Sequence, residues 1–240
     1  MEILAEKTVR EIAVEEPSSV RVFESLGIDY CCGGKRRLTD ACTHANVDLT
    51  YILNRLQSAK QKEQTLPGDD WSEKPLSKLT AFIVDAHHDY VRREIPRIEG
   101  LFGKVLTRHG QAHPEIARAQ ELFAALSQEL TTHMPKEERV LFPYIERMEQ
   151  AAASGATLPK PVFETVQRPI ATMMSEHDEA GALLGQIRSL ANNFTPPDGA
   201  CPTFIALYRA LEDFERDLHR HVHLENNILF PRALELENAA

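Results

Sequence analysis

Apolar residues recur with a helical period along most of the chain. Four long segments carry an apolar residue every three or four positions, as one buried helix face requires, and they span 76–108, 115–151, 162–192 and 202–236. Turn-forming residues separate them, and almost no stretch alternates as a strand does. Long helices with short connections pack antiparallel, so the pattern predicts an all-α protein with an up-down four-helix bundle.

The first part of the chain has shorter helical patterns. Thr8 is placed to start a helix that Pro17 breaks, and the next ones run from Ser18 to Leu26 before Gly27, from Leu38 to Thr43, and onward from Asp48. We therefore expect a small helical domain over residues 1–58, a polar linker over 59–75 and the bundle over 76–240. Prolines 96, 135, 143, 169 and 231 are expected to kink or end their helices.

Composition narrows the functional classes. The net charge of −9 argues against a nucleic-acid partner. No apolar run is long enough to span a membrane, and the acidic N-terminus lacks the apolar core of a signal peptide. We therefore expect a cytoplasmic protein. Its four cysteines are then expected to be thiols that serve as core residues, metal ligands or redox groups.

An internal repeat identifies the candidate chemistry. The segments HMPKEERVLFP and HVHLENNILFP, which begin at His133 and His221, share the pattern H-x3-E-x3-L-F-P at an offset of 88 residues. His88-Asp89 and His177-Asp178 repeat at an offset of 89. The second half of the bundle thus repeats the first.

The spacing places these side chains in one layer. A histidine and a glutamate four residues apart share a helix face, which pairs His133 with Glu137 and His221 with Glu225. The four repeat histidines follow one another at intervals of 45, 44 and 44 residues, so helical hairpins return each to the same height. Buried carboxylates are costly unless they are paired or bind metal.

We therefore predict a centre of two metal ions. Its ligands are His88, His133, Glu137, His177, His221 and Glu225. Two glutamates bridging the ions leave two histidines for each ion, and with an oxo or hydroxo bridge one position per ion stays open. Mixed imidazole and carboxylate donors favour iron, with manganese or zinc as alternatives. The competing interpretation is a set of satisfied core histidines and surface ion pairs.

Neighbouring residues refine the prediction. His219 and His223 lie two residues either side of His221, on the opposite helix face, and are expected at the surface. The His-Asp repeat favours His88 over His87 as the ligand. Glu129 and Asp217 each precede a ligand histidine by one turn, so both are candidate acceptors for imidazole N–H groups.

Together these motifs resemble a known family. The two H-x3-E motifs and SEHDEAG around His177 are similar to the hemerythrin-like bundles, and GIDYCCGGKRRL adds the Cys-Cys pair of the iron–sulfur cluster repair di-iron proteins. The resemblance covers nearly the whole chain. It implies a non-haem di-iron centre on the six ligands and a homodimer that repairs clusters damaged by nitric oxide or oxidants. It also implies that iron can leave the centre for repair. Hemerythrin's oxygen site uses five histidines, whereas this chain offers four.

Cys31 and Cys32 are candidate reactive thiols. The following Gly33 and Gly34 allow close approach, and the cationic run 35–37 is expected to lower a thiol pKa. The alternative is a buried tight turn. We expect these thiols to contact a client protein, or to receive iron or nitric oxide, near the metal centre. Cys42 is expected in the core, and Cys201 is assigned no role.

Three functions remain compatible with the sequence. The first is repair of damaged iron–sulfur proteins, with the centre as iron donor. The second is an enzyme, namely a di-iron nitric oxide reductase or peroxidase that uses the open positions. The third is a sensor or reversible binder of oxygen or nitric oxide. The sequence leaves open whether the protein is an enzyme.

Overall fold

We describe the protein from a computed structural model that covers residues 5–61, 71–157, 161 and 163–239. Within those ranges every named element is a helix, and the single β-type contact is an isolated bridge between Thr8 and Arg37. The predicted all-α class is confirmed. In the described part of the chain, no helix combines the length and the apolar character needed to cross a bilayer.

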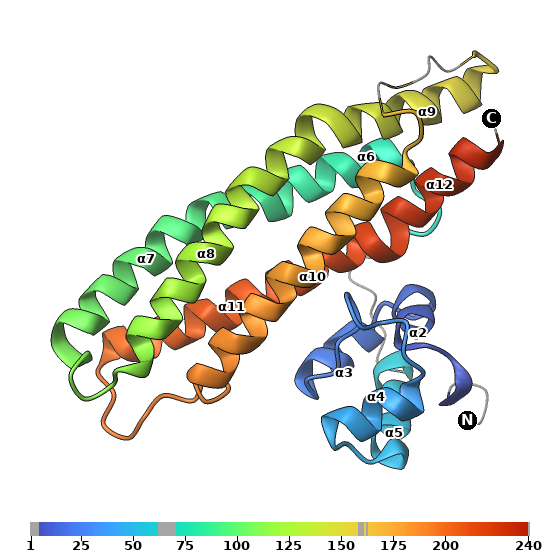
Figure 1. The fold of residues 1–240 in the computed structure, drawn as a ribbon. Helices are drawn as coiled ribbons and strands as arrows, with labels where there is room; N and C mark the ends of the chain where they lie inside the picture. Colours follow the sequence, from blue (N-terminus) through green and yellow to red (C-terminus); the bar gives the residue numbers. More distant parts are fainter. Residues whose placement is uncertain (1–4, 62–70, 158–160, 162, 240) are drawn as a thin grey trace.

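In the described part of the N-terminal unit (Figure 1), four short helices are named, α2 (Val9–Glu15), α3 (Ser19–Ser25), α4 (Leu38–Ala45) and α5 (Leu49–Gln61). Gly27 follows α3 at a φ of 65°, and Asp48 Oδ1 accepts the Tyr51 N–H at 2.8 Å at the start of α5. Apolar faces of the four helices enclose a core of their own, in which Cys42 is buried as predicted. The predicted linker began at residue 59, but α5 continues to Gln61, and positions 62–70 lie outside the described residues.

The cap of α2 gives a first prediction. Thr8 Oγ1 accepts the Glu11 N–H at 3.2 Å, and Glu11 Oε2 accepts the Thr8 N–H at 2.8 Å. We expect Thr8→Ala to lower the free energy of unfolding by about 1 kcal/mol, measured by urea denaturation, because the Glu11 N–H loses its side-chain acceptor. Thr107→Ala is the control, since that hydroxyl donates only to a carbonyl of its own helix and should cost less. Equal losses in both variants would contradict the prediction.

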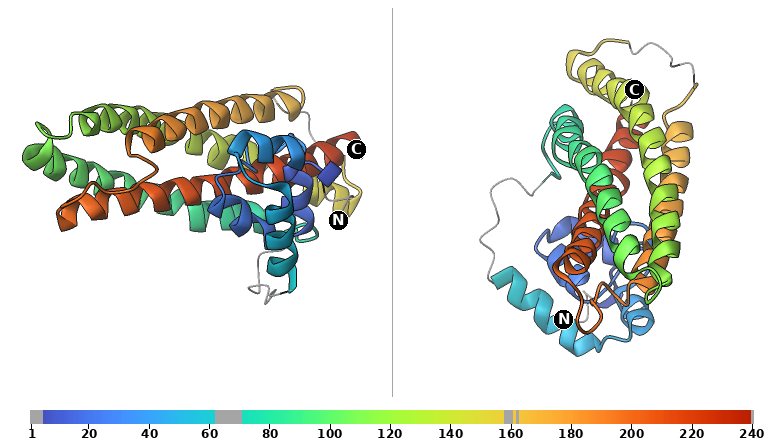
Figure 2. Two further views of the ribbon diagram at one scale, coloured as in Figure 1. Left: turned by 90° about the horizontal axis from the view of Figure 1, so that it is seen from below. Right: turned by 90° about the vertical axis from the view of Figure 1, so that its left-hand side faces the viewer.

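All four predicted long segments are helical. The first consists of α6 (Leu76–Phe82), η1 (Ile83–His88) and α7 (Asp89–His109). The second consists of α8 (Glu115–Lys136), η2 (Glu137–Leu141) and α9 (Phe142–Ser154). The third is α10 (Gln167–Leu190), which starts later than predicted, and the fourth joins α11 (Pro202–Leu224), η3 (Glu225–Leu229) and α12 (Phe230–Ala239). The segments run side by side (Figure 1), and the N-terminal unit lies on one side of the bundle (Figure 2).

The elements named η are π-helical turns, and proline chemistry accounts for two of them. Phe142 donates its N–H to the Glu137 carbonyl, five residues back, and Phe230 does the same to Glu225. Pro143 and Pro231 come next, and neither has an N–H to continue an α-helical ladder. In contrast, helix α7 runs on past Pro96 to His109, whereas α8 ends at Lys136, one residue after Pro135.

The bundle core has two apolar parts with a polar layer between them. One part contains Phe102, Phe123 and Phe214, and the other contains Phe142 and Phe230. In each of the four segments, the predicted metal ligands lie near the point where residues of one cluster give way to residues of the other. Apolar residues thus border the polar layer on both sides.

Candidate metal centre

The six predicted ligands meet at the middle of the bundle. His88 ends η1, His133 lies in α8, Glu137 begins η2, His177 lies in α10, His221 lies in α11 and Glu225 begins η3. All six side chains are buried, with exposed fractions between 0 and 3%. π-Helical turns are frequent at functional sites, and here three of them begin or end on a ligand.

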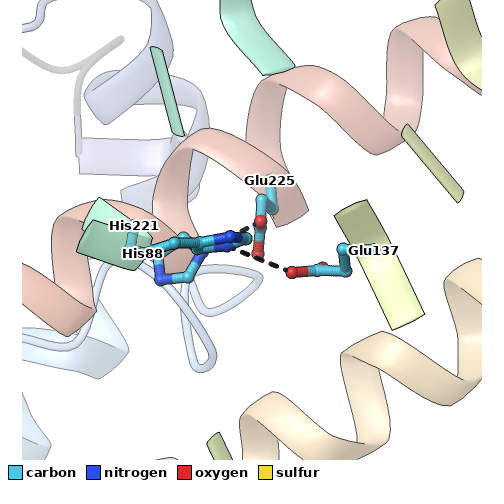
Figure 3. A group of neighbouring side chains, drawn as sticks. All are labelled: His88, Glu137, His221 and Glu225. Atoms are coloured by element: carbon cyan, nitrogen blue, oxygen red, sulfur yellow. Dashed lines mark hydrogen bonds and ion pairs between the residues drawn. The ribbon is translucent and has the colours of Figure 1, made fainter. Parts of the chain in front are cut away.

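These donors form two groups that share both glutamates. One group is His88, Glu137, His221 and Glu225, and the other is His133, Glu137, His177 and Glu225. In each group the ligand atoms lie within 4.8 Å of one another. Figure 3 shows the first group, with both carboxylates directed towards the imidazole rings.

Each carboxylate faces one imidazole of either group. Glu225 Oε1 lies 2.9 Å from His221 Nε2, and its Oε2 lies 3.1 Å from His177 Nε2. Glu137 Oε2 lies 3.4 Å from His88 Nε2 and 3.2 Å from His133 Nε2. This is the arrangement expected of two carboxylates shared by two metal ions.

Several donor atoms lack the hydrogen-bond partners that a metal-free core would require. His88 Nε2 lies 3.2 Å from His221 Nε2, and His133 Nε2 lies 3.1 Å from His177 Nε2, so nitrogen faces nitrogen in both pairs. Both oxygens of Glu137 are buried without a hydrogen bond in the described structure. Nitrogen and oxygen donors without a thiolate suit iron, manganese or zinc, so the residues fit the predicted centre.

Electrostatics keeps the carboxylates ionised. Burial opposes ionisation of Glu225, but His221 and His177 outweigh it and hold the pKa of that carboxyl well below its usual range. The pKa of Glu137 is lowered for the same reason, against burial and the nearby Glu225. Burial opposes protonation of His133, yet Glu137 raises its pKa to about 9. Metal binding there therefore competes with a proton.

Comparison with known proteins identifies the family. Residues 79–233 match the Hemerythrin HHE cation binding domain, and residues 5–60 match a Domain of Unknown function, DUF542. Iron-sulfur cluster repair protein YtfE of Yersinia pestis (strain Pestoides F) is 39% identical over 228 residues, which are 94% of this chain and 96% of the relative. The same protein of Yersinia pseudotuberculosis serotype IB (strain PB1/+) matches to the same extent. This chain belongs to the iron–sulfur cluster repair family with a hemerythrin HHE domain.

In this family member, three ligand imidazoles have an outer acceptor from a neighbouring segment. His88 Nδ1 lies 2.6 Å from Glu138 Oε1, His133 Nδ1 lies 2.8 Å from Glu176 Oε2, and His177 Nδ1 lies 2.9 Å from Asn226 Oδ1. Such contacts fix the ring and direct Nε2 at the metal. The sequence prediction missed all three acceptors. Glu138 and Asn226 could have been found, since each directly follows a glutamate of the H-x3-E repeat.

Neither predicted outer acceptor, Glu129 or Asp217, contacts the histidine predicted for it. Glu129 makes no hydrogen bond to His133 in the described structure, and its Oε2 is buried without a partner. Asp217 Oδ1 lies 3.0 Å from Nδ1 of His87, not from its predicted partner His221. Glu129 and Asp217 were predicted from spacing within one helix, whereas the acceptors observed for His88, His133 and His177 come from neighbouring segments.

Surface positions were predicted wrongly for two histidines. His223 is 5% exposed and His219 is half-buried, and their ring centroids lie 5.3 and 6.3 Å from that of Tyr30. The helix turns them away from the ligand layer, as expected, but the N-terminal unit covers that side. Asn227 Nδ2 joins the parts by donating to the Tyr30 carbonyl at 2.9 Å. His87 belongs to neither donor group, in agreement with the choice of His88.

The Cys31-Cys32 turn packs directly against a ligand helix. Cys32 Sγ lies 3.7 Å from the His177 carbonyl oxygen, and the two sulfurs are 3.8 Å apart as free thiols. Asp29 Oδ1 accepts the N–H of both cysteines at 3.0 Å. A Cβ on Gly34 would lie 2.5 Å from the Tyr30 carbonyl oxygen, so the turn requires glycine there.

The expected effect of the cationic run is wrong for Cys31. The Cys32 thiol and burial raise the pKa of Cys31 well above its usual value, and Asp29 raises it further. Lys35, Arg36 and Arg37 are exposed, and Arg37 pairs with Glu6 instead. Charges adjacent in sequence are thus directed away from the thiol.

A cavity of about 240 Å³ reaches the centre between α8, α10 and α11. The cavity is lined by three histidines and three glutamates, among other residues: His133, His177, His221, Glu129, Glu176 and Glu179. Burial, with Glu179 and Glu176, raises the pKa of Glu129. A small molecule or a cation can therefore reach the candidate metal ligands through a cavity that is lined by carboxyl groups.

Proposed function

We propose that this protein holds two non-haem iron ions and supplies iron for the repair of iron–sulfur clusters damaged by nitric oxide or oxidants. The observation that carries the proposal is the buried layer of six donors, in which two carboxylates are shared by two pairs of histidines. The relatives named as repair proteins support it across nearly the full length of both chains.

The residues have distinct roles in this proposal. His88 and His221 would hold one ion, His133 and His177 would hold the other, and Glu137 and Glu225 would serve both. Four protein donors per ion are fewer than iron accepts, so bound iron supplies open positions for a small ligand such as nitric oxide or oxygen. The buried carboxylates stay ionised, and the cavity beside α8 and α10 is the path by which iron leaves.

A reconstitution experiment tests the function. The full chain is loaded with Fe(II) without oxygen, and iron is counted per chain before and after mixing with a nitric oxide-damaged [4Fe–4S] protein. We expect the client's cluster to recover while this protein loses a matching amount of iron. Catalytic consumption of nitric oxide without loss of iron would favour the reductase instead.

The cysteine turn gives a second prediction. We expect Cys31→Ala/Cys32→Ala to keep its iron but to lose most of its repair rate, because the thiols lie beside the His177 helix and not among the donors. Cys201→Ala is the control, since Cys201 lies at the start of α11, away from the N-terminal unit. Iron content and cluster recovery are measured for both variants. Full repair by the double variant would rule out a role for the thiols.

The proposal also covers setting and assembly. We propose a small N-terminal domain over residues 1–58 that presents the thiols and a metal-binding domain over 76–240. We propose that the protein acts in the cytoplasm, where reducing conditions keep the thiols free. Its proposed clients are damaged iron–sulfur proteins. A homodimer is proposed from the family resemblance, and sedimentation of the iron-loaded chain tests it.

A further inference from the structure

One ligand histidine lacks the outer partner that the other three have. His221 Nδ1 is buried without a hydrogen bond in the described structure. A histidine that binds metal through Nε2 carries its proton on Nδ1, so this N–H has no acceptor. Outer acceptors of this kind strengthen metal binding, and their loss commonly costs about 10–100-fold in affinity.

An acceptor of the right kind lies nearby but serves another ring. Asp217 precedes His221 by one turn on the same helix and thus shares its face. Its Oδ1 lies 3.0 Å from His87 Nδ1, while its Oδ2 is buried without a partner. The His87 ring is stacked parallel to that of His221, with centroids 5.6 Å apart. His87 therefore holds the carboxylate that would otherwise be available to His221.

The internal repeat shows what is unusual about this position. His87 precedes His88, and the equivalent residue before His177 is Glu176. Glu176 accepts from His133 Nδ1 at 2.8 Å and Asn226 serves His177, so both imidazoles of this donor group have an outer partner. In the donor group of His88 and His221, His87 stands at the position equivalent to Glu176 and contacts Asp217. The surroundings of the two donor groups thus differ at one position of the repeat.

We infer that His87 makes the two metal positions unequal, so that iron held by His88 and His221 leaves before iron held by His133 and His177. His87 acts as a positioning residue, because it withholds Asp217 from His221 and is not itself among the donors. This inference rests on the proposed function. It specifies which ion is supplied first and why the second is retained longer.

Iron release to a chelator tests the inference on the full chain loaded with Fe(II). We expect two phases of similar amplitude for the wild type. His87→Phe keeps an aromatic ring against His221 and Phe82 but frees Asp217, and it should slow the fast phase about ten-fold. In the double variant His87→Phe/Asp217→Asn this slowing should disappear, because it requires the carboxylate. A fast phase unchanged in His87→Phe, or slowing that survives in the double variant, would overturn the inference.

Two further variants keep the test decisive if His87→Phe folds poorly. Asp217→Asn alone should leave the fast phase unchanged, since Asp217 does not serve His221 in the wild type. Glu176→Gln should accelerate the slow phase, since it weakens the acceptor of His133. A faster fast phase in Asp217→Asn would contradict the inference. Failure of the chain to bind iron at all would instead contradict the proposed function, so the two failures are distinguishable.

Discussion

Glu225→Gln is expected to abolish binding of both iron ions, whereas His221→Ala should mainly remove one. The two oxygens of Glu225 face His221 at 2.9 Å and His177 at 3.1 Å, one histidine from each donor group. Glutamine keeps the size of the side chain but loses its charge, so it can no longer bridge two cations. Iron per chain, counted after anaerobic loading and desalting, should fall from about two to nearly none in the glutamine variant.

A matched substitution separates this effect from a general loss of acidic charge. Glu121→Gln changes an exposed carboxylate on α8 that pairs only with Arg118 among the described contacts, and its iron content should match the wild type. Circular dichroism should show all variants folded, because the apolar clusters on both sides of the layer are untouched. One tightly bound iron in Glu225→Gln would show that this carboxylate does not bridge.

The ligand layer was predictable because local periodicity and chain repetition both act on it. A spacing of four residues places His133 beside Glu137 on any helix, and near-equal intervals return each histidine to one height in a bundle. The structure brings together all six residues that these rules selected. The resemblance to a known family then related the N-terminal unit with its Cys31-Cys32 pair to the bundle, which periodicity alone does not do.

Those rules could not predict contacts between separate segments. Glu138 and Glu176 serve histidines on neighbouring helices, and which of them faces which ring depends on how the helices pack. Asp217 lies on the predicted face of α11, yet a residue from η1 reaches it first. Helical spacing states which side chains share a face but not which neighbour they meet.

The cysteine turn shows the same limit for charge. The sequence places three cations at positions 35–37, close after Cys32, but the chain turns at Gly33 and Gly34 and leaves those side chains exposed. The nearest charged group to the Cys31 sulfur is the Asp29 carboxylate, at 3.4 Å. The environment of a thiol is set by the packed turn and by the bundle beside it, so sequence proximity gave the wrong direction for the pKa.

Acidification is expected to destabilise the protein through His223. Burial of this ring lowers its pKa to about 4, and Arg10 and Arg220 act in the same direction. In the unfolded chain the ordinary value is about 6.5, so between these values the unfolded state binds the proton more readily. His223 therefore gives its full contribution above about pH 6.5 and loses it progressively as the pH falls towards 4. Between pH 7.5 and 5 the loss should be about 2 kcal/mol.

Urea denaturation of the wild type and His223→Gln at both pH values measures this contribution. Glutamine retains an acceptor for Asn227, which donates to His223 Nδ1 at 2.9 Å, but it does not titrate. The difference in unfolding free energy between pH 7.5 and 5 should therefore be smaller in the variant by about 2 kcal/mol. Equal pH dependence in the two proteins would mean that the ring is accessible to protons while the chain is folded. Because Asn227 also donates to the Tyr30 carbonyl, we expect protonation of His223 to weaken one of the contacts between the N-terminal unit and the bundle.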